Sequence, residues 1–164
     1  MDWFAVMTRP RHEHKVQDQL ARKQLETFLP TIGVWSRWKD RRKKVHWPLF
    51  PCYCFARFEP RELLPILTCA GVVQIVSVNA EPASIPDSEI EGLQRLVRSE
   101  LQFDPCPLIR EGTRVRVVHG PLTGAIGRLV RKGTDARLVL SVELLGRAVS
   151  VQVDACDVER ADAP

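Results

Sequence analysis

The chain has 164 residues, of which 45% are hydrophobic and 27% are charged, and its formal net charge is +4. This composition is typical of a globular protein and is enough for one sizeable domain or two small ones. No apolar run approaches the roughly 18 to 20 residues that cross a bilayer, and the start of the chain lacks the regions of a signal peptide, so we expect a cytoplasmic protein without membrane contact.

The first third of the chain predicts strands and one surface helix. Residues 3–8 are a short apolar run rich in β-formers and predict a strand buried on both faces. Residues 11–24 are mostly polar, with Val16 and Leu20 four positions apart, which is typical of a helix with a narrow apolar stripe. Residues 31–35 predict a second strand.

A basic run with interspersed tryptophans follows at residues 36–47. The first 60 residues carry twelve Lys and Arg against six Asp and Glu, and half of these cations lie in this run. Lysine and arginine neutralise phosphates and a tryptophan ring stacks on bases, so one interpretation is contact with nucleic acid. The other is a solvated hairpin tip whose tryptophans anchor it to the core. The cations of this basic loop are Arg37, Lys39, Arg41, Arg42, Lys43 and Lys44.

Residues 50–58 alternate as a strand with two different faces. Tyr53, Phe55 and Arg57 share one face, and small or apolar residues occupy the other. The aromatic face is either part of the core or an exposed patch for protein binding. The pattern alone favours the core.

Two further helices and one strand complete the first half of the chain. A short or distorted helix is predicted from residue 59 to 67, because Pro65 interrupts it, and a strand is predicted over 72–78. A third helix opens at residue 86, with Ser88 and Glu91 as a possible capping box. The order β-α-β-β-α-β-α predicts a ferredoxin-like α+β sandwich.

The second half of the chain predicts a small all-β domain. Residues 103–109 include two prolines and are interpreted as a linker between a domain at 1–102 and a domain at 110–164. Four or five short strands in about 50 residues favour a small closed barrel. The predicted strands cover residues 114–118, 125–130, 138–144 and 148–153.

No constellation of residues in the sequence predicts catalysis, a metal or a cofactor. The four histidines do not share a ligand face, and phosphate-binding, zinc-protease and nucleophile-elbow motifs are missing from the sequence. The five cysteines have no C-x-x-C pair and are expected to be reduced, buried and structural. We therefore expect a protein that is not an enzyme and has no cofactor.

Three glycines interrupt strand-like sequence in the segment Val115-Arg-Val-Val-His-Gly-Pro-Leu-Thr-Gly-Ala-Ile-Gly127, where they allow a tight turn and close backbone approach. This segment resembles a KOW motif. Trp3-Phe4-Ala5-Val6 resembles the opening strand of the NusG N-terminal (NGN) domain, and Pro48-Leu-Phe-Pro-Cys-Tyr-Cys-Phe55 is similar to that family's "FPGYVF" and "PLFPNYLF" forms. The chain therefore resembles the NusG family of transcription elongation and antitermination factors, and most closely its RfaH-like specialised paralogues.

The resemblance implies an NGN domain that binds the clamp helices of the largest RNA polymerase subunit, followed by a KOW domain of the SH3-like barrel type. Phe50, Tyr53 and Phe55 would lie in or beside the hydrophobic surface that makes this contact. This reverses the interpretation that the pattern alone favours. The factor would then bridge the DNA channel, hold the clamp closed and suppress pausing or termination.

The resemblance also assigns surfaces to DNA and to further partners. The residues that would face upstream DNA and the displaced non-template strand are Arg9, Arg11, His14, Lys15 and Arg22. The tip of the KOW domain, at Gly120, Pro121, Leu122 and Gly124, would contact Rho or a small-subunit ribosomal protein. Leu122 stands where the family usually has Phe, and Cys52 stands where it has Gly or Asn. A monomer is expected.

Three functions are compatible with these features. The first is a specialised, operon-specific NusG paralogue, the second is the general housekeeping factor that also engages Rho, and the third is a ribosome- or RNA-binding KOW protein without polymerase contact. Coverage of the whole NGN pattern argues against the third. The "PLFP-x-Y-x-F" form, the basic run and Leu122 favour the first.

Overall fold

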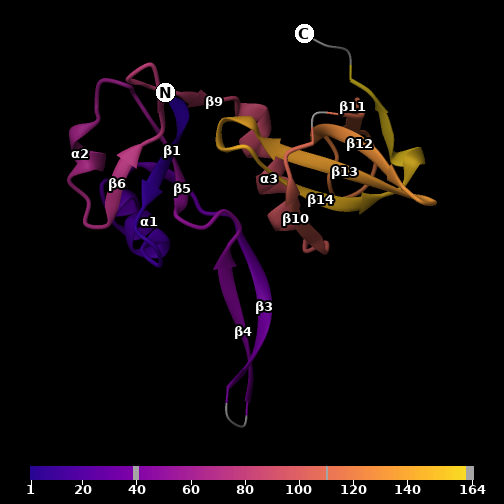
Figure 1. Ribbon diagram of the computed structural model, residues 1–164, viewed down its shortest axis with the longest axis horizontal. Coiled ribbons are helices and arrows are strands. Elements are labelled where there is room, and N and C mark those ends of the chain that lie inside the picture. Colours follow the sequence, from indigo (N-terminus) through magenta and orange to yellow (C-terminus); the bar gives the residue numbers. More distant parts are fainter. Residues whose placement is uncertain (39–40, 110, 162–164) are drawn as a thin grey trace. The chain divides into compact units, whose positions relative to one another are not determined.

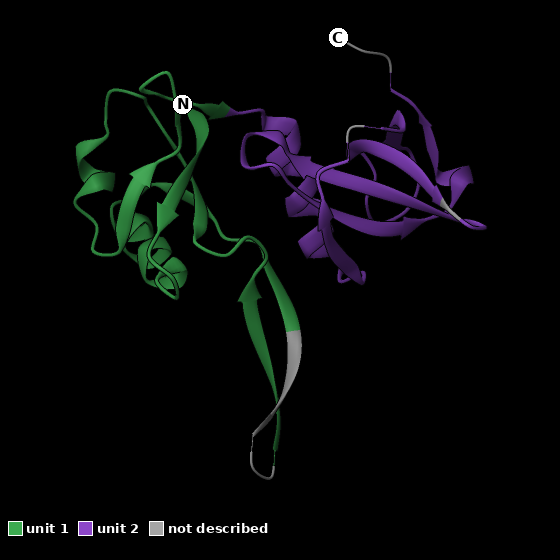
Figure 2. Ribbon diagram, in the orientation of Figure 1, with its two compact units in different colours: residues 1–84 green, residues 85–164 purple. Residues whose placement is uncertain are grey.

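The computed structural model describes residues 1–38, 41–109 and 111–161, with residues 34–38 and 132 described by their backbone alone. The chain divides into two compact units, unit 1 from Met1 to Ser84 and unit 2 from Ile85 to Pro164 (Figure 2). Each unit has its own sheet and is described by itself. The predicted fold class, an α+β N-terminal part followed by a β-rich C-terminal part, is confirmed.

Unit 1 is built on an antiparallel sheet in the order β2–β5–β1–β6 (Figure 1). The central strand β1 pairs with β5, so that Ala5 lies opposite Phe55, and on its other side with β6, where Val6 lies opposite Ile75. The elements of unit 1 are β1 (Asp2–Thr8), α1 (Glu13–Arg22), β2 (Glu26–Phe28), β3 (Thr31–Trp38), β4 (Arg41–Pro48), β5 (Tyr53–Phe58), α2 (Leu64–Leu67), β6 (Val72–Ile75), β7 (Ser77–Val78) and β8 (Glu81–Pro82), and β9 (Ser84–Ile85) lies at the division of the units.

The core of unit 1 forms where α1 packs on the sheet. Val16 and Leu20, the two apolar residues that predicted the helix stripe, are fully buried. They pack with Phe4, whose ring stacks on Phe58 at a centroid distance of 4.5 Å, and with Ile66 of α2. Burial of such side chains supplies most of the stability of a small α+β unit.

The basic run forms a two-stranded ribbon. Strands β3 and β4 pair without interruption from Thr31 opposite Pro48 to Trp38 opposite Arg41, and the ribbon projects from the body of unit 1 (Figure 1). A loop over 36–47 is therefore wrong for most of its length, whereas the alternative interpretation of this run as part of a hairpin agrees with the pairing. Its basic residues are compatible with pairing as strands, because water satisfies the outer backbone edges of a two-stranded ribbon and the side chains of 41–44 are exposed.

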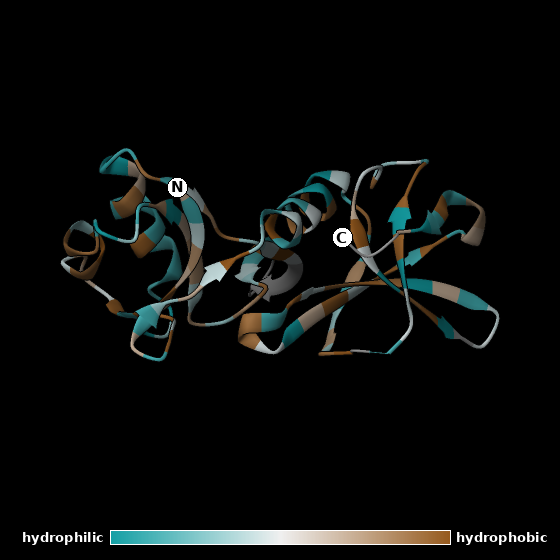
Figure 3. Cartoon of the chain, turned by 90° about the horizontal axis from the view of Figure 1, so that it is seen from above, coloured by the Kyte–Doolittle hydropathy of each residue, from teal (hydrophilic) through white to brown (hydrophobic). Residues whose placement is uncertain are grey.

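Unit 2 contains a six-stranded antiparallel sheet in the order β10–β14–β13–β12–β11–β15. Hydrophobic and hydrophilic residues are interspersed along its strands (Figure 3), and the fully buried positions include Leu138 and Val149. Its elements are α3 (Asp87–Ser99), β10 (Phe103–Pro107), β11 (Thr113–Val117), β12 (Ile126–Lys132), β13 (Asp135–Val142), η1 (Glu143–Leu145), β14 (Arg147–Val153), η2 (Ala155–Asp157) and β15 (Val158–Arg160).

Helix α3 groups with the strands of unit 2 and contacts β12 and β13. The helix meets the sheet at Gly92, where an added Cβ would lie in ordinary van der Waals contact, 3.4 Å from Leu140 Cδ2. The boundary between the compact units therefore falls at 84/85, before α3, whereas the sequence suggests a boundary after it. The predicted capping box is wrong, because Pro86 is the N-cap residue and Ser88 lies inside the first turn.

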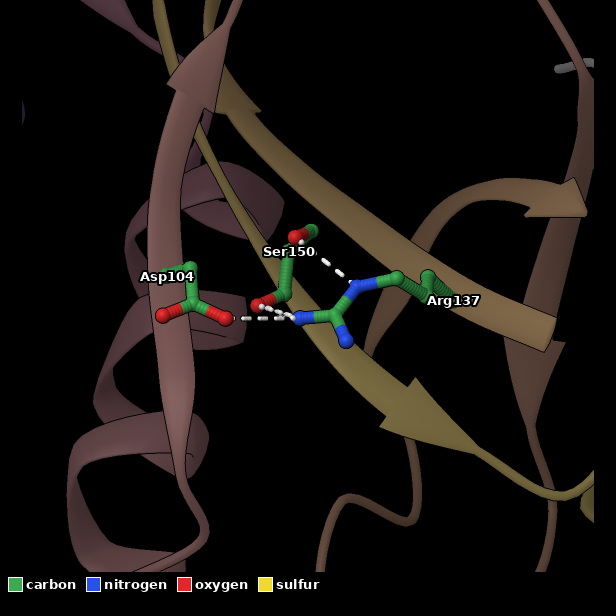
Figure 4. Close-up of polar contacts among 3 residues, drawn as sticks. All are labelled: Asp104, Arg137 and Ser150. Atoms are coloured by element: carbon green, nitrogen blue, oxygen red, sulfur yellow. Dashed lines mark hydrogen bonds and ion pairs between the residues drawn. The ribbon is translucent and has the colours of Figure 1, made fainter. Parts of the chain in front are cut away.

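The segment predicted as a linker over 103–109 contains strand β10, which pairs with β14 from Phe103–Val151 to Pro107–Arg147. A polar link fastens it to the sheet (Figure 4): Arg137 Nη2 donates to Asp104 Oδ2 at 3.1 Å, and Arg137 Nε donates to Ser150 Oγ at 3.1 Å. The prolines that suggested a linker are compatible with this position, because β10 is an edge strand.

Candidate functional site

The cations that the sequence assigns to nucleic acid lie on two parts of unit 1, the segment 9–22 that includes α1 and the ribbon. All five basic residues that the sequence assigns to a DNA-facing surface are exposed. In the ribbon, the side chains of 41–44 are also exposed, whereas Lys39 and the side chain of Arg37 lie outside the described residues. The structure thus leaves every described cation of both predicted sets free to meet solvent or a polyanion.

The turn before α1 is held in a fixed conformation. Arg11 has a φ of +64°, in the left-handed region that non-glycine residues rarely adopt. The ring nitrogen Nδ1 of His12 lies 2.9 Å from the carbonyl oxygen of Pro10, and the backbone N–H of Arg9 donates to the carbonyl of Gly71 at 2.8 Å. The side chains of this turn therefore project from an ordered backbone.

A second ordered turn precedes β5. Cys52 has a φ of +70°, and its backbone N–H donates to Glu13 Oε1 at 2.8 Å. The carbonyl of Cys52 accepts a hydrogen bond from the N–H of Thr8, also at 2.8 Å. Glu13 is only 5% exposed, so its carboxylate is used inside unit 1 to connect α1 with this turn.

The aromatic residues that resemblance assigns to polymerase binding are mostly inside the structure. Phe55 is fully buried and Phe50 is 2% exposed; their rings meet edge-on at a centroid distance of 6.2 Å. Tyr53 alone is partly exposed. The expectation that all three rings form an exposed patch is therefore corrected: only the ring of Tyr53 is accessible. The burial of Phe55 agrees with the core interpretation that the strand pattern favours.

A mostly apolar groove lies at the foot of the ribbon, and we call it the ribbon groove. Its volume is about 530 Å³. Trp47 is 53% exposed beside it. The groove is lined by Pro10, Arg11, Glu13, His14, Val45, His46, Trp47, Pro48, Pro51 and Cys52. It therefore joins the two ordered turns to strand β4.

Unit 2 has a cavity of about 400 Å³ beside the start of α3. Glu89 and Glu143 line it together with Arg114 and Arg128. Burial, followed by the charge of Glu143, raises the pKa of Glu89 to about 7, although a backbone hydrogen bond from Glu143 opposes this. Glu89 Oε2 is buried without a hydrogen-bond partner among the described atoms. This carboxyl group is therefore poised to bind a proton near neutral pH.

The turn predicted to bind a partner in the C-terminal part is formed, but one of its residues is not accessible. Gly120 and Gly124 have φ values of +94° and +92°, which explains their residue type. Pro121 is exposed, whereas Leu122 is 2% exposed. A Cβ at Gly124 would lie 3.2 Å from the guanidinium carbon of Arg95 in α3. The expectation that Leu122 forms the tip of a contact surface is therefore corrected.

The cysteines differ in environment. Cys54 and Cys69 are buried, and burial raises the pKa of Cys54 to about 12. Cys156 is exposed, and Cys52 and Cys106 are half-buried, so the prediction of buried thiols holds for only two of the five. Within the described ranges there is no group of three or more potential metal-ligating side chains. None of the described helices is long and apolar enough to span a membrane.

Sequence reasoning missed several of these features. The link between Glu13 and Cys52 joins residues 39 positions apart, and the pair formed by Glu89 and Glu143 joins α3 to η1, so no local pattern reveals either. For Cys52 a signal existed, because a residue that replaces glycine or asparagine before a strand suggests a left-handed backbone. The exposure of Trp47 depends on its position at the foot of the ribbon, which the local sequence does not reveal.

The comparisons with known proteins agree on one family. The family model described as "Transcription termination factor nusG" matches residues 1–94. A transcription termination/antitermination protein NusG from Lactococcus lactis is 26% identical, over 96% of this chain and 91% of that protein. The protein of the same name from Thermus thermophilus is 23% identical, over 98% of this chain and 99% of its own length.

Among solved structures, NusG of Thermotoga maritima is similar with a TM-score of 0.54 and 19% identity, covering 98% of this chain and 97% of that one. At 19% identity this similarity supports a shared fold only. It extends over both units, so the order of an α+β part and a β-rich part is the one found in that protein.

Proposed function

The chain belongs to the NusG family of transcription factors, which are not enzymes, and on that premise we propose that it binds RNA polymerase during elongation and suppresses pausing or termination. The observation that carries this proposal is the extent of the likeness. Its NusG relatives are covered over nearly their whole length, and the family model spans the residues that build unit 1.

The proposed polymerase contact is made by an NGN domain over 1–102 with the clamp helices of the largest subunit. Tyr53 is its accessible anchor, because an aromatic ring has few rotatable bonds and loses little conformational freedom on binding. Phe50 and Phe55 are buried and pack edge-on against each other. A KOW domain over 110–164, after the segment 103–109, offers Gly120, Pro121 and Gly124 to Rho or a small-subunit ribosomal protein.

The proposed nucleic-acid contact is made by the basic residues of segment 9–22 and by the cations of the ribbon. These exposed side chains have few acidic neighbours on the same segments, and a surface of this kind attracts the phosphates of upstream DNA and of the non-template strand. Contact with polymerase and DNA together favours the closed clamp, which is the elongation-competent state.

A pull-down with purified RNA polymerase tests the polymerase contact. Tyr53→Ala should weaken capture at least tenfold, because truncation of an interface hot spot commonly costs about 2 kcal/mol or more. Val73→Ala, at a position that is 53% exposed on β6, is the matched control and should bind as the unchanged chain does. Unchanged capture of the Tyr53 variant would remove the proposed surface. Phe55→Ala is unsuitable as a test, because Phe55 is fully buried and its truncation is expected to destabilise unit 1.

We propose an operon-specific paralogue in preference to a general factor that also engages Rho. Its support is the "PLFP-x-Y-x-F" segment together with Leu122, which is smaller than the family's usual Phe and buried. Mapping of the genomic sites bound by the chain separates the two. Binding confined to a few operons supports the paralogue, whereas binding to most transcribed genes supports the general factor.

A further inference from the structure

We propose that the ribbon groove binds one unpaired base of a single-stranded nucleic acid, with the base stacked on Trp47 and the adjoining phosphates on the cations around the groove. The inference rests on the proposed contact with nucleic acid and adds to it a site, a ligand class and a stacking residue. Four features of the groove lead to it.

The first feature is an aromatic ring left open to a cavity of suitable size. Trp47 is 53% exposed although it lines an apolar groove, and the cavity of about 530 Å³ accommodates a planar heterocycle beside the ring. The other apolar parts of the lining are three prolines and Val45. Every base has a π-face that stacks on such a ring, so the site requires no particular base sequence.

The second feature is the sign of the charge. The groove is lined by Arg11 and the imidazoles of His14 and His46, and its single acidic residue, Glu13, is 5% exposed and accepts a hydrogen bond from the Cys52 N–H. The carboxylate is therefore turned to an internal partner. What remains at the surface is an apolar floor edged by the Arg11 guanidinium and by two imidazoles that can form hydrogen bonds, which matches a base with an adjoining phosphate.

The third feature is the continuity of the groove with the ribbon. Strand β4 runs from Arg41 at the far end to Trp47 at the foot, and four consecutive exposed cations, 41–44, precede the groove on the same strand. The stem of Lys44 crosses β3, since a Cβ at Gly33 would collide with Lys44 Cε. A polyanionic strand that follows β4 would reach the groove directly. An acidic peptide would satisfy the cations but has no need of an open indole ring.

The fourth feature is the rigidity of the walls. Arg11 and Cys52, which both line the groove, have positive φ values. Backbone strain of this kind persists where surrounding contacts hold it, and it occurs often at ligand clamps. Here the hydrogen bonds of Cys52 to Glu13 and Thr8 hold one wall. A preformed site binds without a large cost of ordering.

Binding of fluorescein-labelled oligo(dT) and oligo(U) to the full chain, measured by anisotropy over a range of NaCl concentrations, tests the inference. Trp47→Ala should weaken binding of the single strand about tenfold, which is the size of one base stack. It should leave the salt slope and the affinity for a duplex of equal length unchanged. Trp47→Phe should retain most of the affinity, because it keeps an aromatic face. The two oligonucleotides reveal whether DNA or RNA is preferred.

Several outcomes would overturn the base site. One is a Trp47→Ala variant that binds the single strand as tightly as the unchanged chain does. Another is an equal loss of affinity for the duplex. A third is a poly-glutamate peptide that displaces the oligonucleotide from the unchanged chain but not from Trp47→Ala. Loss of polymerase capture by Trp47→Ala would also overturn the base site, because the groove would then serve the polymerase. The proposed nucleic-acid contact fails differently: if replacement of Arg41, Arg42, Lys43 and Lys44 by Ser leaves the salt slope unchanged, the ribbon does not contact phosphates.

Discussion

Cys52 holds the turn before β5 in the left-handed region, at a φ of +70°, where a Cβ crowds the neighbouring carbonyl. The glycine that the family resemblance expects at this position has no such cost. Cys52→Gly should therefore raise the free energy of unfolding by up to about 1 kcal/mol, after allowance for the greater freedom of glycine in the unfolded chain. Urea denaturation followed by tryptophan fluorescence measures the change. Cys52→Val, with a branched side chain at the same φ, should lower the stability, and an equal effect of both variants would contradict this explanation.

Glu89 provides a dependence of stability on pH. Its pKa is raised from 4.5 to about 7, first by burial and then by Glu143, while Arg114 and Arg128 line the same cavity. Between these two pH values the folded chain keeps a proton that the unfolded chain releases. The contribution of this group to stability is therefore greatest below pH 4.5 and declines as the pH rises to 7. Because the side chain is partly exposed, solvent screening limits the total to about 1 kcal/mol.

The variant Glu89→Gln isolates that contribution. Its free energy of unfolding should exceed that of the unchanged chain by about 1 kcal/mol at about pH 8, and the difference should shrink as the pH falls to about 5. Denaturation at a series of pH values gives this difference. Glu111→Gln, at an exposed position of unit 2, removes a carboxylate without burial and should show no such trend. A difference that does not vary with pH would mean that Glu89 is ionised throughout.

At the scale of the element, helix α3 packs against β13 at Gly92. A methyl group at Gly92 would meet Leu140 Cδ2 at 3.4 Å, which is an ordinary contact, and alanine favours the helix over glycine by about 1 kcal/mol. Gly92→Ala should therefore keep or raise the stability of unit 2. Gly92→Leu should lower it by about 1 to 3 kcal/mol, because the larger side chain overfills the contact. Thermal unfolding of both variants tests this, and a stable Gly92→Leu would show that the helix is not closely packed.

We expect the ribbon to act through its exposed positive charges. Replacement of its four consecutive cations by serine should reduce the slope of log affinity against log salt for single-stranded DNA by about 0.7 for each phosphate that the chain no longer neutralises. The same change should scarcely alter the stability, because these side chains are exposed. Anisotropy titrations at several salt concentrations give the slope. Replacement of Arg114, Arg116, Arg131 and Arg147 of unit 2 by serine removes equal charge and should leave the slope nearer that of the unchanged chain.

At the scale of the whole molecule, the division into units predicts which fragments fold. The contacts of α3 with β12 and β13 lie within unit 2, and its inner residues Ile90, Leu93 and Leu96 are fully buried. A fragment of residues 85–164 should therefore unfold at a higher temperature than one of residues 103–164, which lacks the helix. Calorimetry of the two fragments measures this. Equal melting temperatures would place the structural boundary after α3, where the sequence suggests it.

The sequence by itself determined the class of each half and the order of most elements, because period-2 and period-3.6 patterns and glycine turns are local properties of the chain. It also determined the family, through the segment around Tyr53 and the glycines of 115–127. Only the tertiary structure decided which of these residues are accessible. Phe50, Phe55 and Leu122 are inside and Trp47 is open because burial depends on what packs above a residue, and a strand pattern does not specify its neighbour. The same reason explains the pairing of β10 with β14 and the meeting of Glu89 with Glu143.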